Sequence, residues 1–355
     1  MSHAFCISHV INLVIIGESS CHDFVLLAHS DVILVDDVAY VWWYDNEGAI
    51  QSNGINFIED SPYFLLLLLC FDRFTAKDRG IVTEFTEREA GHCVLSLPSL
   101  DSSCPDSAFT IEIGLTDKIR DHYGIMGRAT RILSATSQST ISGPQGESRN
   151  LKDTELVVKI YWSEASLIDE AKVIERANQI ADQNKHVKEH LPDLIWSCNF
   201  AKYSTRNIRT AFGIKSESHR VLRVMLFRRL YPITDLTGDR FWKAFWQCFR
   251  CKFTSSTHCQ RLSHADALTV LGHYHLWRGG VEHNDISVSN LMYDKANKDR
   301  RILNDFDLAH VRGEPRPSGT ERTGTMPSMA LDLLTEDAWA VEHLSSCVLP
   351  CSLES

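Results

Sequence analysis

The sequence predicts an α+β protein in two lobes, because segments typical of strands come first along the chain and segments typical of helices follow. Apolar residues make up 44% of the 355 residues, which is enough for a sizeable core. A single lysine, Lys159, stands in an otherwise apolar strand, and two loops that each contain an aspartate lie further along. The polar residues suited to chemistry are therefore divided between the two predicted lobes.

The N-terminal residues carry both strand and helix signals. Residues 32–44 are rich in β-branched and aromatic residues and predict strands, which end at a turn over Asp45–Gly48. Residues 60–75 predict a helix around the nine-residue apolar run Tyr63–Phe71. A spanning helix needs about 20 apolar residues, so we expect a buried core helix and no membrane anchor. No lysine or arginine precedes the apolar stretch Val10–Ile16, so no signal peptide is expected.

The middle of the chain predicts a strand, a helix and a second strand. Residues 134–150 are rich in Ser, Thr, Gly and Gln and predict a loop. A strand over Glu155–Trp162 precedes a helix that we expect to begin at Ser166, since Asp169 three residues later gives a pattern similar to a capping box. A further strand is predicted over 220–227.

Two more helices are predicted after Pro232. The first has Phe241, Phe245 and Phe249 on one face, and the second runs from about Ser263 to the glycine pair at 279 and 280. Both follow the strands, as expected for a helical second lobe.

Charge is unevenly distributed. The net charge of −10 argues against a general nucleic-acid binder. Residues 1–115 hold 4 Lys and Arg against 17 Asp and Glu, whereas residues 201–261 hold 13 against 3. Two interpretations remain open: two solvated faces of opposite sign, or an acidic N-terminal part that docks on the basic segment.

The chain has 11 cysteines, an odd number without regular spacing, which predicts a reduced, intracellular protein, cytoplasmic or nuclear. Cys248 and Cys251 have the spacing of zinc ligands, with His258 and Cys259 downstream. Adjacent residues are a poor geometry for two ligands of one tetrahedral ion, so buried thiols are the preferred interpretation.

The residues that suit phosphoryl transfer come in two acidic loops. Asp285 and Asn290 lie five residues apart, and Asp305 follows a short apolar segment further along. Mg²⁺ prefers oxygen ligands such as these. We expect a hairpin to bring the three side chains into one cleft. Upstream, Lys159 is costly to bury unless it is paired, and Glu170 in the next helix is the expected partner.

These residues resemble the protein-kinase signature set. His283-Asn284-Asp285 with Asn290 is similar to the catalytic loop, Asp305-Phe306-Asp307 to the metal-binding motif, and Val-Val-Lys159 to the third-strand lysine. Gly324–Asp332 resembles the end of an activation segment. The segments Val41–Gly48 and Arg220–Leu236 narrow the resemblance to the fungal-type protein kinase domain family, over roughly residues 38–335.

The resemblance implies a role for each matching residue. Lys159 would bind the α- and β-phosphates of ATP, Glu170 would hold Lys159, and Asp285 would accept the proton of the substrate hydroxyl. Asn290 and Asp305 would coordinate Mg²⁺.

The resemblance also implies where the nucleotide is held. Backbone groups of Phe227, Arg228, Arg229 and Leu230 would meet adenine at the hinge between lobes. Gly124 and Gly127 would belong to the glycine-rich loop that covers the phosphates, although the third glycine of that loop is missing.

Two further departures from the family pattern affect the expectations. Asn284 replaces the arginine that normally pairs with a phosphorylated activation loop. The family's large lobe continues for several helices beyond the position of Asp332, so we expect a truncated C-terminal lobe. The expected division is an N-terminal extension over 1–115, a kinase-like N-lobe over 116–230 and an incomplete C-lobe over 231–355.

The expected function is ATP- and Mg²⁺-dependent phosphoryl transfer to Ser or Thr of an unidentified protein substrate, with neither nucleic acid nor membrane as a partner. The alternative is a pseudokinase, a nucleotide-binding or interaction module without turnover. A small-molecule kinase on the same architecture is a third possibility, since such enzymes also often lack the arginine at Asn284.

Overall fold

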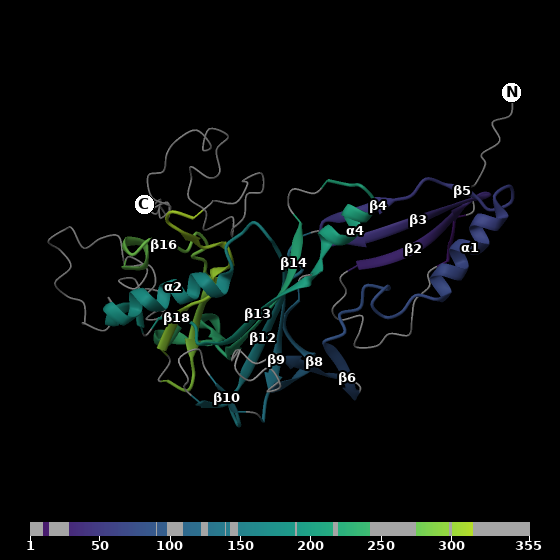
Figure 1. Cartoon of the computed structure of the whole chain (residues 1–355). Coiled ribbons are helices and arrows are strands. Elements are labelled where there is room, and N and C mark those ends of the chain that lie inside the picture. Colours follow the sequence, from purple (N-terminus) through teal and green to yellow (C-terminus); the bar gives the residue numbers. More distant parts are fainter. Residues whose placement is uncertain are drawn as a thin grey trace. The chain divides into compact units, whose positions relative to one another are not determined.

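The computed structural model describes residues 10–13, 28–89, 91–97, 109–121, 127–138, 140–142, 148–188, 190–215, 219–241, 275–297 and 300–314. The chain forms two compact units (Figure 1). Unit 1 comprises residues 1–165 and 195–227, and unit 2 comprises residues 166–194 and 228–355. The predicted boundaries at 115 and 230 stay predictions.

Unit 1 contains most of the strands. Its elements are β1 (Val10–Leu13), β2 (Ala28–Val35), β3 (Val38–Asp45), β4 (Gly48–Gln51), β5 (Ile55–Asn56), α1 (Ser61–Asp72), β6 (Phe85–Glu89), β7 (His92–Leu97), β8 (Phe109–Asp121), β9 (Arg131–Thr136), β10 (Thr140–Ser142), β11 (Ser148–Asn150), β12 (Leu156–Glu164), β13 (Leu194–Ser204), α4 (Thr205–Ala211) and β14 (Arg220–Arg228).

The first sheet of unit 1 is an antiparallel meander, β1-β2-β3-β4, with β5 added beside β3. It confirms the strands predicted over 32–44. The predicted turn joins β3 to β4, where Asp45 lies opposite Gly48. The Asp45 carboxylate accepts the backbone N–H groups of Glu47 (2.8 Å) and Gly48 (3.1 Å), an arrangement by which aspartate stabilises turns. Gly48 has φ of 135°, which a residue with a Cβ rarely adopts.

Helix α1 forms where the sequence predicts a helix, but the expectation of a buried core helix is wrong. Phe64, Leu67, Leu68 and Phe71 form the partly covered stripe, and Phe64 contacts the ring of Phe57 at 5.5 Å. The opposite stripe is open to solvent, with Leu65 63% and Leu66 56% exposed. A run of leucines covers every side of a helix, so composition alone could not show that one side lacks a cover.

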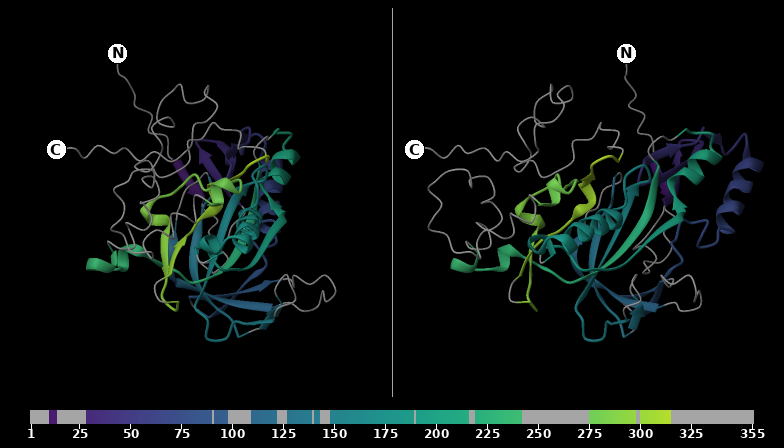
Figure 2. Two further views of the ribbon diagram at one scale, coloured as in Figure 1. Left: turned by 90° about the vertical axis from the view of Figure 1, so that its left-hand side faces the viewer. Right: turned by 60° about the vertical axis from the view of Figure 1, so that its left-hand side comes forward.

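The second sheet of unit 1 is larger, with strand order β13-β14-β12-β9-β8-β7-β6. Its strands are the blue to teal-green arrows in the two views of Figure 2. Alternate residues on these strands point into one apolar core, as the two-residue period of a strand requires. On β12 the core positions include Val158 and Ile160, so Lys159 and Tyr161 point to the opposite face. Lys159 is 4% exposed, and its ammonium lies 5.1 Å from the centre of the Tyr161 ring.

Unit 2 combines one long helix with short strands. Its elements are α2 (Glu170–Gln183), α3 (Lys185–Lys188), β15 (Tyr231–Pro232), η2 (Ile233–Asp235), β16 (Val281–Glu282), η5 (Val288–Asn290), β17 (Leu291–Asp294), β18 (Arg300–Leu303), η6 (Phe306–Leu308) and β19 (His310–Val311).

Helix α2 begins later than predicted. Its N-cap is Asp169, whose side chain accepts the N–H of Ala171 at 3.0 Å, so Ser166 is not the cap. Aspartate and serine are comparable N-caps, and the pattern did not decide between them. Val173 and Ile174 are buried, as expected for the inward face. Strands β17 and β18 form an antiparallel hairpin, with β15 on the outer edge of β17.

Several predicted features lie outside the described residues. They are most of the helix through Phe245 and Phe249, the start of the helix at Ser263, the four candidate zinc ligands, Gly124 and the segment 324–332. The end of the Ser263 helix is described, since residues 275–278 are helical and Gly280 follows with φ of 89°. Within the described ranges, no helix is both long enough and apolar enough to span a membrane.

Candidate active site

The candidate active site in unit 2 is centred on the loop between β16 and β17. The amide nitrogen of Asn290 donates to the carboxylate of Asp285 at 2.8 Å and to the backbone carbonyl of Asp285 at 2.9 Å. Asn290 is 3% exposed, so its side chain is held firmly against Asp285. The five-residue spacing seen in the sequence is thus closed by two hydrogen bonds.

Asp305 follows β18 and is the N-cap residue of the single turn η6. The preceding residue, Asn304, donates its backbone N–H to the carbonyl of Asn290 at 2.9 Å, so the two acidic loops lie side by side. Asp305 has φ of 66°, a left-handed conformation that is uncommon for residues other than glycine and clusters at functional sites. The structure therefore brings Asp285, Asn290 and the backbone beside Asp305 together in one unit.

Glu170, the first residue of α2, is also tied to this loop. Its carboxylate accepts the backbone N–H of Phe306 at 3.2 Å, and its side chain is almost fully buried. Beyond α3, which follows α2, the backbone carbonyl of His190 accepts the N–H of Leu303 at 3.1 Å. The ends of β18 and η6 are thus anchored to the segment that begins with α2.

The two residues before Asp285 have separate structural roles. The His283 ring packs edge-on against Phe306 at 4.6 Å, and its Nε2 lies 3.0 Å from the carbonyl of Asn304. Asn284 has φ of 61° and donates from its side chain to the carbonyl of Leu308 at 3.2 Å. Asparagine tolerates the left-handed region better than most residues, which gives Asn284 a local reason to be asparagine.

The remaining predicted residues are distributed along the chain. Lys159 belongs to unit 1 and Glu170 to unit 2, so their predicted pairing stays a prediction.

The predicted hinge residues lie where the chain passes from unit 1 to unit 2, between Phe227 and Arg228. Arg228 donates its N–H to the carbonyl of Asp193 at 3.2 Å, and its side chain lies 3.4 Å from the Asp193 carboxylate. Arg229 stacks its guanidinium over Tyr231 at 5.3 Å, and Leu230 precedes β15.

Gly127 is the described part of the predicted glycine loop, which connects β8 to β9. Its φ is 110°, and its N–H donates to the carbonyl of Asn46 at 2.9 Å. Asn46 is at the tip of the β3–β4 hairpin, so the N-terminal sheet reaches the segment expected to cover the phosphates. Nothing in the sequence pattern indicated this contact, because 80 residues separate the two.

A buried ion cluster behind that hairpin was also missed. Arg209 of α4 donates to both carboxylate oxygens of Asp45, at 2.6 and 3.2 Å, and its Nε lies 3.1 Å from Glu47. Thr205 donates its hydroxyl to Glu47 at 2.6 Å. Lys202 on β13 makes a further ion pair with Glu84. The acidic N-terminal part thus docks on the basic segment at these positions, as the second interpretation of the charge pattern predicts.

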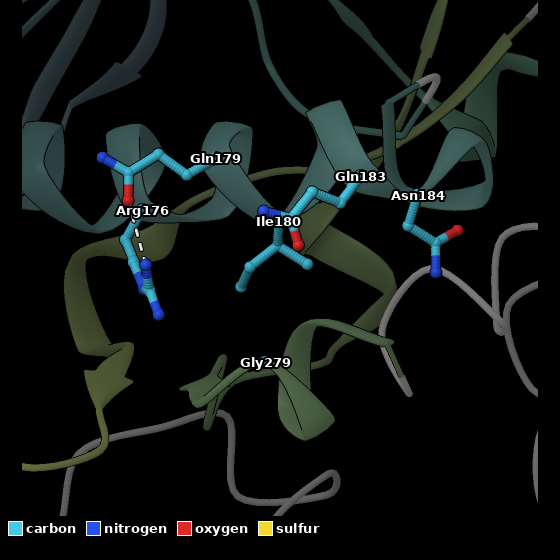
Figure 3. Close-up of a pocket in the computed structure, with 6 residues that line it drawn as sticks. All are labelled: Arg176, Gln179, Ile180, Gln183, Asn184 and Gly279. Atoms are coloured by element: carbon cyan, nitrogen blue, oxygen red, sulfur yellow. Dashed lines mark hydrogen bonds between the residues drawn. The ribbon is translucent and has the colours of Figure 1, made fainter.

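A pocket lies along the exposed side of α2, between this helix and Gly279 (Figure 3). Ile180 points toward Gly279, where an added Cβ would come within 2.5 Å of the isoleucine side chain. Arg176 donates to the side-chain oxygen of Gln179 at 3.0 Å. The lining residues are Arg176, Gln179, Ile180, Gln183, Asn184 and Gly279. The lining holds none of the residues predicted for catalysis.

The oxygen donors of the Asp285 loop fit magnesium. Asn290 uses its amide nitrogen toward Asp285, which leaves its amide oxygen as the side-chain atom suited to a cation. Asp305 supplies a carboxylate on the adjoining loop. Mg²⁺ in proteins is usually held by one or two side chains together with water and substrate phosphates, so a set of two is sufficient. No cluster of three or more His, Cys, Asp or Glu side chains with metal-binding geometry occurs in the described part of the chain.

The fold and these loops define the protein as kinase-like. One unit has a seven-stranded sheet with a buried lysine on β12, and the other has an Asp–Asn loop beside the β17–β18 hairpin that Asp305 follows. The sequence matches the model of a protein family described as "Fungal protein kinase" over residues 29–225 and 259–348. The chain therefore belongs to the fungal protein kinase family, as the sequence motifs predict.

Two solved kinases resemble the chain. The Cydia pomonella granulovirus kinase PK-1 is 16% identical, with 62% of this chain and 61% of that chain covered and a TM-score of 0.32. Vaccinia related kinase 3 is 11% identical, with 71% and 63% covered and a TM-score of 0.39. The chain thus spans less than two thirds of the length of each. No match was found among curated protein sequences.

Proposed function

We propose that the chain transfers the γ-phosphoryl group of ATP to a Ser or Thr hydroxyl of a protein substrate. The observation that supports this most directly is the pair of hydrogen bonds from Asn290 to Asp285, on a loop bonded to the residue before Asp305. Kinase-like function follows from the family, while the nucleotide, the metal and the acceptor are parts of the proposal.

In the proposed step, the substrate oxygen forms a bond to the γ-phosphorus as the bond from that phosphorus to the ADP oxygen breaks. The hydroxyl proton passes to the carboxylate of Asp285. The amide of Asn290 holds this carboxylate at 2.8 Å, so one of its oxygens is fixed and the group is oriented before substrate arrives. A magnesium ion, when held by Asn290 and Asp305, would neutralise charge on the phosphate oxygens.

Lys159 would supply the cation that holds the α- and β-phosphates. It is 4% exposed and lies on the face of β12 opposite the apolar core. Its positive charge would offset part of the negative charge of the two phosphates. The hinge residues Phe227 to Leu230 would meet adenine through their backbone groups.

The pseudokinase remains the alternative because of the glycine loop. The N–H of Gly127 donates to Asn46, so this amide is already used within the protein. With the Gly127 amide engaged, one backbone donor fewer is open to a phosphate oxygen at this position. Nucleotide binding without turnover is the result that this alternative predicts.

The test is transfer of label from γ-labelled ATP with Mg²⁺ to a mixed protein substrate, followed by identification of the labelled amino acid. We expect Asp285→Asn to lower turnover at least about 100-fold while nucleotide affinity is retained, since the carboxylate acts on the proton and not on the nucleotide. Asp235→Asn, at an exposed aspartate of η2, is the matched control. Equal label in wild type and Asp285→Asn would refute the proposal, and nucleotide binding without label would support the pseudokinase.

A further inference from the structure

The β3–β4 hairpin is held in place more firmly than an ordinary surface turn. Asp45 is 5% exposed and Arg209 is 8% exposed, so their pairing at 2.6 and 3.2 Å is buried. Arg209 also donates to the carbonyl of Gly48 at 3.4 Å. Thr205, which is 2% exposed, donates to Glu47 and accepts the N–H of Arg220 at 2.8 Å. The hairpin tip is therefore fixed against α4 and the start of β14.

The hairpin tip in turn holds residues 127–130, which run from Gly127 of the glycine loop to the start of β9. The carbonyl of Asn46 accepts the N–H of Gly127, and the carbonyl of Arg128 accepts the N–H of Trp162 on β12 at 2.7 Å. The segment is thus held from two sides, by the N-terminal sheet and by the strand that carries Lys159.

The same segment carries backbone strain. Ala129, two residues after Gly127, has φ of 41°, in the left-handed region that alanine rarely adopts. Strain of this kind persists only where the surroundings impose it, and it tends to occur at functional sites. The hydrogen bonds at Gly127 and Arg128 precede it in the chain, and Ala129 itself packs against the apolar core of unit 1.

We propose that the β3–β4 hairpin is a positioning element for the nucleotide, with Asn46 fixing the glycine loop at Gly127 and Arg209 locking the hairpin in place. This inference rests on the proposed function, because it assumes that the loop covers ATP. The hairpin thus restrains from outside a loop that lacks the third glycine of the family pattern. Arg209, Asp45 and Glu47 touch no substrate and act through the loop.

Two measurements on the full chain test the inference. The first is hydrogen exchange of the Gly127 amide, and the second is the Kd for ATP with Mg²⁺. The variants are Arg209→Lys, which keeps the charge but loses the forked geometry, and Asp45→Asn, which keeps the shape but loses the charge. Lys202→Gln is the matched control, because Lys202 pairs with Glu84 elsewhere in unit 1 and its side chain is 62% exposed. Thermal unfolding confirms that each variant is folded at the assay temperature.

We expect both hairpin variants to raise the exchange rate of the Gly127 amide and to raise the Kd for ATP about tenfold, since small losses of positioning are costly. Lys202→Gln should change neither. Faster exchange with an unchanged Kd would overturn the positioning role, and unchanged exchange would overturn the link from hairpin to loop. A wild-type chain that binds no ATP would refute the proposed function and, with it, the role of the hairpin in nucleotide binding. The exchange rate of the Gly127 amide would still test separately whether the hairpin restrains the loop.

Discussion

Replacing Arg209 with methionine is expected to destabilise unit 1 by about 3 kcal/mol. Arg209 lies 2.6 Å from Asp45 and 3.1 Å from Glu47, and the Asp45 side chain is only 2% exposed. Removing one partner of a buried ion pair costs about 3–5 kcal/mol, because the remaining charge stays buried. Asp45 keeps the N–H groups of Glu47 and Gly48 as partners, so the lower end of that range applies.

The measurement is urea unfolding followed by tryptophan fluorescence, with Lys202→Met as the comparison. Lys202 pairs with Glu84 at the surface, and its side chain is 62% exposed, so its loss should cost about 0–1 kcal/mol. In the double variant Asp45→Asn with Arg209→Met, part of the stability should return, since no uncompensated charge remains at Asp45. An Arg209→Met variant no less stable than Lys202→Met would show that the cluster does not stabilise the hairpin.

Three further changes have expected outcomes. Glu170→Leu should lower the free energy of unfolding by about 1–3 kcal/mol because Phe306 loses its acceptor, whereas Glu170→Gln should cost less, and equal losses in denaturant titrations would contradict this. Burial lowers the pKa of the His219 ring in the folded chain below its ordinary value of 6.5, so the unfolded chain takes up a proton at a higher pH than the folded chain does. The free energy of unfolding should therefore fall as pH falls through 6.5. His219→Gln should flatten that part of the pH–stability curve, and an unchanged curve would exclude His219 as the cause. Leu65→Gln with Leu69→Gln should reduce binding of a hydrophobic dye without loss of helicity, since the two side chains are 63% and 44% exposed, and a loss of helical signal would show instead that they are packed.

The sequence predicted the elements whose periodicity is strong. The strands over 32–44 and 220–227 and the helix with Val173 and Ile174 buried all occur, since alternation and helical spacing record which side of an element faces the core. The pairing of Asp285 with Asn290 was likewise accessible, because both residues lie in one short loop. Local patterns were therefore sufficient where the partners are near in sequence.

The sequence failed where the partner is distant or where a pattern is degenerate. The contact of Gly127 with Asn46 and the pairing of Arg209 with Asp45 join residues that no local period connects. The charge imbalance between residues 1–115 and 201–261 gave only the sign of the interaction, not the residues. Helix α1 was expected to be buried because its apolar run is too short to span a membrane, but whether each side of the helix is covered depends on tertiary packing.

The arrangement of restraints in the two units suggests a common principle. In unit 2 the Asp305 loop is bonded both to Asn290 and, through Phe306, to the first residue of α2. In unit 1 the segment 127–130, which begins with Gly127 of the glycine loop, is bonded both to β12 and to the hairpin. Each expected phosphate- or metal-binding segment contains a residue with positive φ and is held from two sides, so the cost of ordering it is met on folding rather than on binding ATP. Loosening either restraint should therefore raise the Kd for ATP as well as lower the free energy of unfolding.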